Sequence, residues 1–371
     1  MLFAFYAITF ILGLEFGGFQ LALLRAANEL GFDGSMMGLP ITIQFLSISL
    51  FPLIFGPISD RIGKKKIIAV FMAVFVLGCF LVWTSETTLG FLIGIFVLGA
   101  GFGVTECSVT AAISDIYTER SESIINLCQS YLCVGAIVSP LILQVLMDEF
   151  SASWRVGFFI CMITMAVILP MILYSRFSQT PVLEQLREKI KLEKPLLLLG
   201  LIICFCIYVG IESSVAFFID TVFTLEMNFP ELGAYAISLF WAAMWLGRFI
   251  IGHIKKIPKN IVTFSLFAMS VVFVLILFCR QEYVMLVLFF ASGLACSCVW
   301  PGIVNLAIAL NRKASGKVMS YLNLGAGIGG MLIPLLNGMI MNLSGMSVSF
   351  LFLIILSIAT GAYILKNQKQ L

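Results

Sequence analysis

Long apolar runs, separated by short polar segments, follow one another along the whole chain. A helix needs about 20 apolar residues to cross a hydrocarbon core of about 30 Å. The strict alternation typical of barrel strands is absent, which excludes an outer-membrane barrel. The pattern predicts an all-α integral membrane protein with twelve transmembrane helices. The predicted spans are 2–24, 37–58, 67–84, 89–113, 125–146, 154–175, 196–224, 233–254, 261–279, 284–310, 318–340 and 347–365.

The distribution of charge predicts the orientation of these spans. If the N-terminus is cytoplasmic, all but three of the 22 Lys and Arg residues fall in cytoplasmic loops or the tail, and Arg25, Arg155 and Arg280 lie outside. Cytoplasmic loops of membrane proteins carry such an excess of basic residues. Both termini are therefore expected in the cytoplasm. The first apolar run lacks a basic segment and a cleavage site, so we interpret it as a retained span.

Composition bounds the chemistry. The chain has ten cysteines, almost all inside apolar runs, one histidine and no Cys-x-x-Cys pair. Such cysteines behave as small buried hydrophobes rather than metal ligands. We expect no metal and no cofactor beyond a coupling ion, and no enzymatic activity, because no nucleophile–base pair is apparent. No basic patch with interleaved aromatic residues suggests a nucleic-acid partner.

The chain divides into two similar halves. The longest polar stretch, 176–195, is predicted to be a cytoplasmic linker between a bundle at 1–175 and a bundle at 196–371. The pattern Ser-Tyr-Leu-x-x-Gly-Ala occurs at 130–136 and again at 320–326, and a proline follows each copy. Parallel repeats of this kind are typical of transporters with a central cavity between two bundles.

The loop 56–66 reads GPISDRIGKKK and resembles the Gly-x-x-x-Asp-Arg-x-Gly-Arg/Lys-Arg/Lys loop of the major facilitator superfamily. The resemblance implies two bundles that rock about a central site. It also implies a gating role for Gly56, Asp60 and Arg61. The alternative is a topology signal that happens to contain an aspartate.

Within that superfamily, 101–106 (GFGVTE), 126–129 (NLCQ) and 208–212 (YVGIE) resemble the fucose permease branch. The resemblance implies a role in proton-coupled sugar uptake for Glu106 and a substrate contact for Gln129. Two departures leave the substrate open: the acid in the first span, Glu15, lies about one turn before the branch's position, and Leu132 replaces a polar residue. The two glycines beside Glu106 are expected to pack closely against neighbouring helices.

Four acids lie inside predicted spans: Glu15, Glu106, Glu212 and Asp220. A charge at mid-bilayer costs about 2.5 to 3.5 kcal/mol. Basic residues are nearly absent from the spans, with only Arg248 near a cytoplasmic end, so no cation partner is expected. Burial without a counter-charge favours the neutral carboxyl group.

Glu106, Glu15 and Glu212 are therefore predicted to carry the coupling ion in one shared aqueous chamber, and Asp220 is expected at a solvated mouth. The alternatives are a protonated glutamate with a structural hydrogen bond and a sodium site.

The remaining polar residues of the spans are mostly amides and aromatic residues. Amides that both donate and accept, beside aromatic faces, suit a neutral polyhydroxylated ligand. Interhelical hydrogen bonding is the alternative. A helix break is expected at Trp300-Pro301. The candidate substrate-binding residues are Gln20, Gln44, Asn126, Gln129, Tyr131, Tyr208, Trp300, Asn305 and Asn323.

These features predict a secondary active transporter, monomeric, in a bacterial inner membrane. The predicted activity is H⁺-coupled or Na⁺-coupled symport of a small neutral, sugar-like solute by alternating access. The alternatives are a proton-driven exporter of amphipathic compounds and a non-transporting membrane receptor. The glycine-rich stretch 325–330 is interpreted as close helix packing rather than a nucleotide site.

Overall fold

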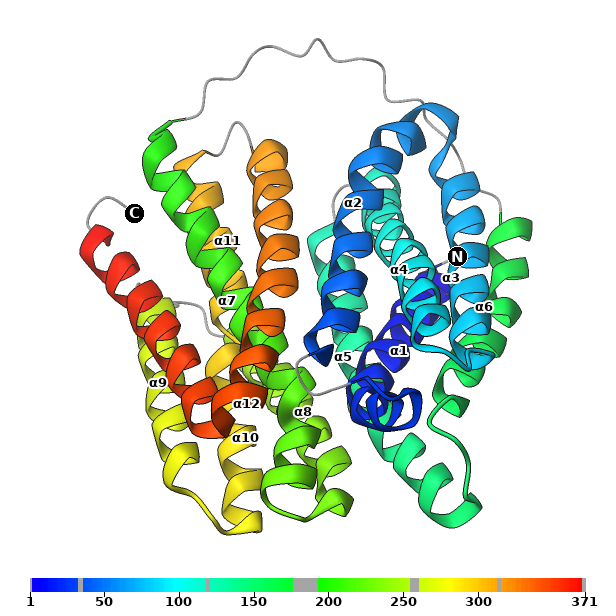
Figure 1. Ribbon diagram of the computed structural model, residues 1–371. Helices are drawn as coiled ribbons and strands as arrows, with labels where there is room; N and C mark the ends of the chain where they lie inside the picture. Colours follow the sequence, from blue (N-terminus) through cyan, green and yellow to red (C-terminus); the bar gives the residue numbers. More distant parts are fainter. Residues whose placement is uncertain are drawn as a thin grey trace. The chain divides into compact units, whose positions relative to one another are not determined.

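The computed structural model describes residues 2–32, 36–117, 121–175, 193–253, 260–311 and 315–368. Within these ranges the chain is built from helices joined by short connections (Figure 1). It forms two compact units, one comprising Met1–Asp33 and Ile43–Gln185 and the other Gly34–Thr42 and Leu186–Leu371. The predicted linker, 176–195, falls almost entirely outside the described residues.

The first unit places α1 at its centre, against α5 and α6, while α3 packs on α4 and α6. Glycines allow the closest approaches: a Cβ atom at Gly101 would lie 2.3 Å from the backbone nitrogen of Phe75, and one at Gly103 would lie 2.3 Å from the carbonyl oxygen of Ile48. The close packing predicted for these two glycines is confirmed. The helices are α1 (Leu2–Leu30), α2 (Gly38–Ile62), α3 (Lys64–Trp83), α4 (Thr88–Ile116), α5 (Ser121–Phe150) and α6 (Val156–Tyr174). The first residues of α2, up to Thr42, belong to the second unit.

The second unit packs α12 against α7 and α9, and α10 against α8 and α9. A Cβ atom at Gly329 would lie 1.8 Å from the carbonyl oxygen of Cys206, so the glycine-rich stretch is a helix-packing surface, as expected. The elements are α7 (Pro195–Thr221), the π-helix η2 (Val222–Glu226), the 3₁₀ helix η3 (Pro230–Leu232), α8 (Gly233–His253), α9 (Ile261–Phe278), α10 (Glu282–Cys296), α11 (Val299–Leu310) and α12 (Ser315–Asn367).

The described residues contain eleven helical segments long and apolar enough to cross a membrane. The last of them, Tyr321–Asn367, covers most of the two final predicted spans, with a non-helical Gly345 (φ 80°) between the two parts. The predicted span 284–310 is divided into α10 and α11 just before Trp300-Pro301, where the break was expected. The two repeat copies lie in α5 and α12, each of which contains an internal proline.

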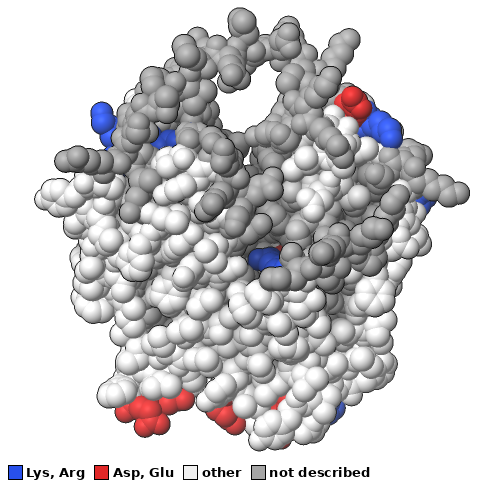
Figure 2. Space-filling view, turned by 180° about the vertical axis from the view of Figure 1, so that it is seen from behind, with Lys and Arg blue, Asp and Glu red and all other residues white. Residues whose placement is uncertain are grey.

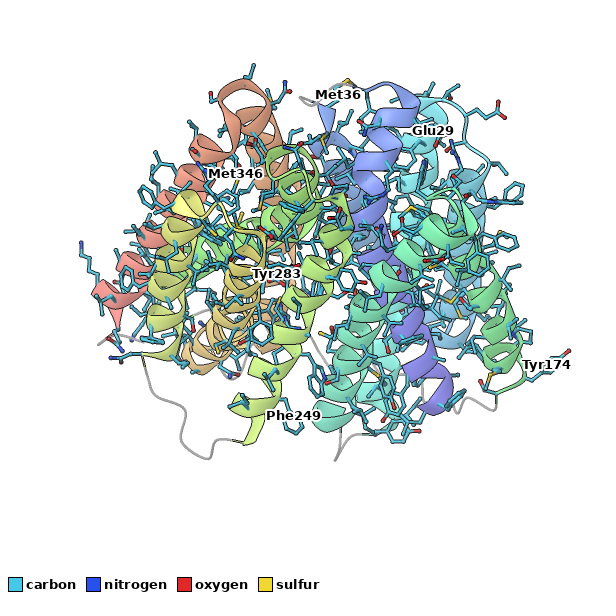
Figure 3. The ribbon with its side chains drawn as sticks, turned by 90° about the horizontal axis from the view of Figure 1, so that it is seen from below. Glu29, Met36, Tyr174, Phe249, Tyr283 and Met346 are labelled. Carbon is cyan, nitrogen blue, oxygen red and sulfur yellow. The ribbon has the colours of Figure 1, made fainter. Side chains whose placement is uncertain are left out.

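Several charged side chains lie at the ends of the helices. Most of the acidic side chains visible in Figure 2 line its lower edge. Within the second unit, Glu226 ends η2, Glu231 lies in η3 just before α8, and Glu282 begins α10. Seen from below, side chains fill the space between helices, and Tyr174, which is 88% exposed, points away from its bundle (Figure 3). The arrangement leaves the middles of the helices mostly apolar, as a membrane requires.

Candidate functional site

Glu106 and Gln129 meet between α4 and α5. The amide Nε2 of Gln129 donates to Oε1 of Glu106 at 3.2 Å, and both side chains are partly exposed. On the same helix as Gln129, Tyr131 stacks on Tyr6 of α1, with ring centroids 5.0 Å apart. The hydroxyl of Thr105, beside Glu106, has no hydrogen-bond partner in the described part of the chain. The structure thus pairs a carboxyl group with an amide between α4 and α5, and it stacks two phenol rings between α5 and α1.

Glu15 is held by a second glutamine. Nε2 of Gln44, on α2, donates to both carboxylate oxygens of Glu15 at 3.0 and 3.2 Å. Glu15 is 1% exposed and Gln44 is fully buried, so Glu15 does not touch an aqueous chamber here. Oε1 of Gln44 finds no hydrogen-bond partner among the described residues. Gln44, predicted as a substrate residue, is the hydrogen-bond partner of the buried acid in this structure.

The two pairs share one chemistry. An amide donates to a carboxylate through N–H, and after a flip it accepts from a carboxylic acid through C=O. A Glu–Gln pair therefore keeps a hydrogen bond in both protonation states. No described Lys or Arg forms an ion pair with Glu15 or Glu106. The surroundings thus lack an opposite charge that would hold either carboxyl group ionised.

Glu212 differs from these acids because it has a cationic neighbour. Nη2 of Arg248, on α8, lies 3.9 Å from Oε1 of Glu212, on α7. The expectation that no cation reaches the intramembrane acids is wrong here, because a long arginine side chain can carry its charge several ångströms along the helix from its Cα atom. Tyr208, one turn before Glu212, is fully buried and donates its hydroxyl to the carbonyl oxygen of Cys296 at 2.8 Å.

Asp220 is not at a solvated mouth, which corrects the sequence-based expectation. The residue is 1% exposed. A Cβ atom at Gly233, the first residue of α8, would lie 2.0 Å from Oδ1 of Asp220. The positive end of a helix favours a nearby carboxylate, so the chain accommodates this acid where helix α8 begins.

The other candidate substrate residues are dispersed. Gln20 is 1% exposed within α1. In the second unit, Trp300 is 37% exposed and its ring lies 5.8 Å from that of the buried Phe205. Asn305 on α11 and Asn323 on α12 are exposed. The side chain of Asn126 lies outside the described part of the structure.

The loop motif is described only in part, since the side chains of Asp60 and Arg61 lie outside the described residues. Gly56 lines a cavity of about 210 Å³ between α2 and α4, and nothing lies within 4 Å of the position that its Cβ atom would take. Lys65 donates to the carbonyl oxygen of Ser175, the C-cap residue that follows α6, at 2.6 Å. The basic run therefore also stabilises a helix C-terminus, where cations are favoured.

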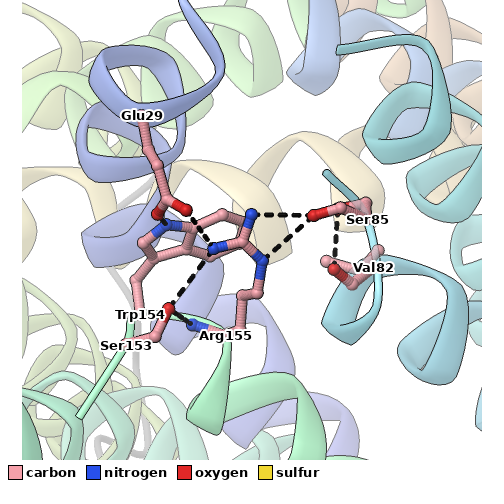
Figure 4. Close-up of polar contacts among 6 residues, drawn as sticks. All are labelled: Glu29, Val82, Ser85, Ser153, Trp154 and Arg155. Carbon is pink, nitrogen blue, oxygen red and sulfur yellow. Dashed lines mark hydrogen bonds and ion pairs between the residues drawn. The ribbon is translucent and has the colours of Figure 1, made fainter. Parts of the chain in front are cut away.

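Sequence reasoning missed a polar cluster that joins three helix ends of the first unit (Figure 4). Arg155 pairs with Glu29 at 2.5 Å, donates twice to the carbonyl oxygen of Ser85 at 3.2 and 2.7 Å, and lies 4.4 Å from the Trp154 ring centroid. The indole of Trp154 also donates to Glu29, at 2.6 Å. The sequence did offer one signal for this cluster: Arg155 is one of only three basic residues predicted on the outer side, and it directly follows a tryptophan.

Apolar helices long enough to cross a membrane define a multi-pass membrane protein, and acids inside such helices are typical of functional sites. The chain belongs to the Major Facilitator Superfamily, whose family model matches residues 5–278 and 201–369. The superfamily resemblance of the 56–66 loop is thereby confirmed. The protein is a transporter and not an enzyme, and its bacterial relatives indicate the inner membrane.

Curated relatives differ in what they transport. A probable plastidic glucose transporter of Arabidopsis thaliana is 28% identical over 40% of this chain and 28% of its own length. An uncharacterized transporter of Buchnera aphidicola is 25% identical over 76% of this chain and 67% of its own. A multidrug resistance protein of Vibrio parahaemolyticus is 26% identical over 36% and 34%. The chain thus matches only about a third of the length of the glucose and multidrug relatives.

Solved structures show the same fold. A peptide transporter in complex with sulfate gives a TM-score of 0.81 at 12% identity, covering 100% of this chain and 94% of that chain. The superfamily transporter FucP, in its outward conformation, gives 0.69 at 16% identity, covering 99% and 97%. At such identities the likeness concerns the fold alone.

Proposed function

We propose that this transporter couples the entry of a cation, in the first place a proton, to symport of a small neutral, sugar-like solute. The observation that carries the proposal is the Glu106–Gln129 pair, a partly exposed carboxyl group with an amide partner at 3.2 Å. Its sequence context resembles the fucose permease branch. A glucose transporter among the relatives supports the sugar-like solute.

Proton coupling requires an acid that is neutral in one state and charged in another. A bare charge at mid-bilayer costs about 2.5 to 3.5 kcal/mol, which protonation removes. The partial exposure of Glu106 gives protons a way in, and Gln129 supplies a hydrogen bond before and after protonation. The Glu15–Gln44 pair would be a second, more deeply buried step of the same kind. The carboxyl and amide oxygens would also suit sodium, so both ions enter the test.

The test uses purified protein in liposomes, with labelled sugars, and compares accumulation driven by an inward proton gradient with counterflow exchange at equal pH. Glu106→Gln is expected to abolish accumulation while counterflow persists in part, because binding remains and coupling is lost. Glu86→Gln, at an exposed acid of the same unit, is the matched control. Repeating the assay with a sodium gradient identifies the ion. Normal proton-driven accumulation by Glu106→Gln would overturn the assignment.

A second candidate is proton-driven export of amphipathic compounds, which the multidrug relative favours. The two functions predict opposite directions of solute movement under the same gradient. Inside-out and right-side-out vesicles with an amphipathic fluorescent cation and a labelled sugar separate them. Extrusion of the cation, without sugar accumulation, would replace the symport proposal. A non-transporting receptor would move neither compound.

A further inference from the structure

The charged pair Glu212–Arg248 stands apart from the acid–amide pairs. Its two side chains come from α7 and α8 of the same unit and are 14% and 30% exposed. At 3.9 Å, the contact between Oε1 and Nη2 is longer than a hydrogen bond. Opposite charges therefore face each other here at a site that solvent or a ligand can reach.

Stability alone gives little reason for this pair. Ionised side chains inside a membrane are costly, and they are characteristic of functional sites. A partly exposed ion pair offsets little of that cost, and it offsets even less when its two side chains do not form a hydrogen bond. Because the pair costs free energy and adds little to stability, a role in binding explains it better than a structural role does.

The backbone behind the pair is firmly fixed. Tyr208, one turn before Glu212, ties α7 to the last residue of α10 through its 2.8 Å hydrogen bond to the carbonyl oxygen of Cys296. Gly247, next to Arg248, packs so closely that a Cβ atom there would lie 2.0 Å from Oγ of Ser297. Both contacts meet at the interruption between α10 and α11. Such rigid support is what a preorganised binding site needs.

We infer that Glu212 and Arg248 together bind two adjacent hydroxyl groups of the transported solute. The inference rests on the proposed function and narrows it. A carboxylate only accepts hydrogen bonds, a guanidinium only donates them, and a hydroxyl group does both. A diol can therefore satisfy both side chains without changing the net charge of the site. An anionic ligand would be repelled by Glu212, and a cationic ligand would be repelled by Arg248. Glu212 becomes a substrate-binding residue rather than a coupling residue.

The test measures sugar binding to the purified full-length protein by calorimetric titration. D-glucose, D-galactose and L-fucose are compared, and the sugar that binds most tightly is repeated with its monodeoxy analogues. Glu212→Gln and Arg248→Gln should each weaken binding about ten- to a hundredfold, the effect of losing a hydrogen bond to a charged group. The double variant should lose little more than either single variant, since both contact one diol. Glu226→Gln and Arg280→Gln, at exposed positions of the same unit, should bind as the wild type does.

The analogues provide the second readout. One deoxy analogue should bind the wild type weakly and should be no worse than the parent sugar in the double variant. If a glutamine variant does not fold, the affinity measurement is made instead with Arg248→Lys or Glu212→Asp, which keep the charges. Unchanged affinity in the variants overturns the inference and leaves the proposed function standing. Loss of proton coupling with unchanged affinity in Glu212→Gln also overturns it. If the wild type binds none of these sugars, both the inference and the proposed sugar symport are wrong.

Discussion

Replacing Arg155 by methionine tests the polar cluster of the first unit. Arg155 donates two hydrogen bonds to the carbonyl oxygen of Ser85, and its side chain is only 14% exposed. Losing these two hydrogen bonds should lower the free energy of unfolding by about 2 kcal/mol. Its partner Glu29 is 50% exposed, so the ion pair adds less than about 1 kcal/mol. The contact with the Trp154 ring adds about 0.5 to 1 kcal/mol.

The sum of about 3 kcal/mol corresponds to a drop of roughly 6 to 12 °C in the melting temperature of a unit of this size. A thiol-reactive dye measures this melting temperature, because Cys79 and Cys161 are buried in the same unit and react with the dye on unfolding. The labelling seen before unfolding, from cysteines that are not buried in the folded protein, sets the baseline. Arg280→Met, at an exposed loop, should melt as the wild type does. If Arg155→Met melts within 2 °C of that control, the account of the cluster is wrong.

Three further substitutions use the same melting assay, two to test packing and one to test a hydrogen bond. Gly101→Ala should destabilise by about 1 to 3 kcal/mol, because its Cβ atom would lie 2.3 Å from the backbone of Phe75. Gly56→Ala, with open space at that position, should melt normally, and equal melting of the two variants would contradict the packing argument. Tyr208→Phe should cost about 1 to 2 kcal/mol, because the carbonyl oxygen of Cys296 loses a donor 2.8 Å away. Unaltered melting would show that this bond contributes nothing.

Hydrophobic runs predicted the helices well because the bilayer fixes both their length and their composition. Small residues at helix contacts were also readable, as Gly101 shows, since close backbone approach leaves no room for a side chain. The interruption near Pro301 followed from the missing amide hydrogen of proline. These features depend on local chemistry, which the sequence states directly.

Side-chain pairing was less predictable. The sequence singled out Glu106 and Gln129 through two separate family motifs but did not predict the hydrogen bond between them. It also did not pair Glu15 with Gln44, 29 positions apart. Arg248 was assigned to a cytoplasmic end because a hydropathy reading places Cα atoms and not the tips of long side chains. Asp220 was expected in water because nothing in the sequence shows that a helix begins beside it.

The most direct test of proton symport is the pH inside liposomes when sugar is added outside without any starting gradient. A trapped fluorescent dye reports this pH. The account predicts that the wild type acidifies the interior as sugar enters, and that Glu106→Gln does not, while Glu86→Gln behaves as the wild type does. Acidification that persists in Glu106→Gln, or an interior that becomes alkaline in the wild type, would contradict the central claim.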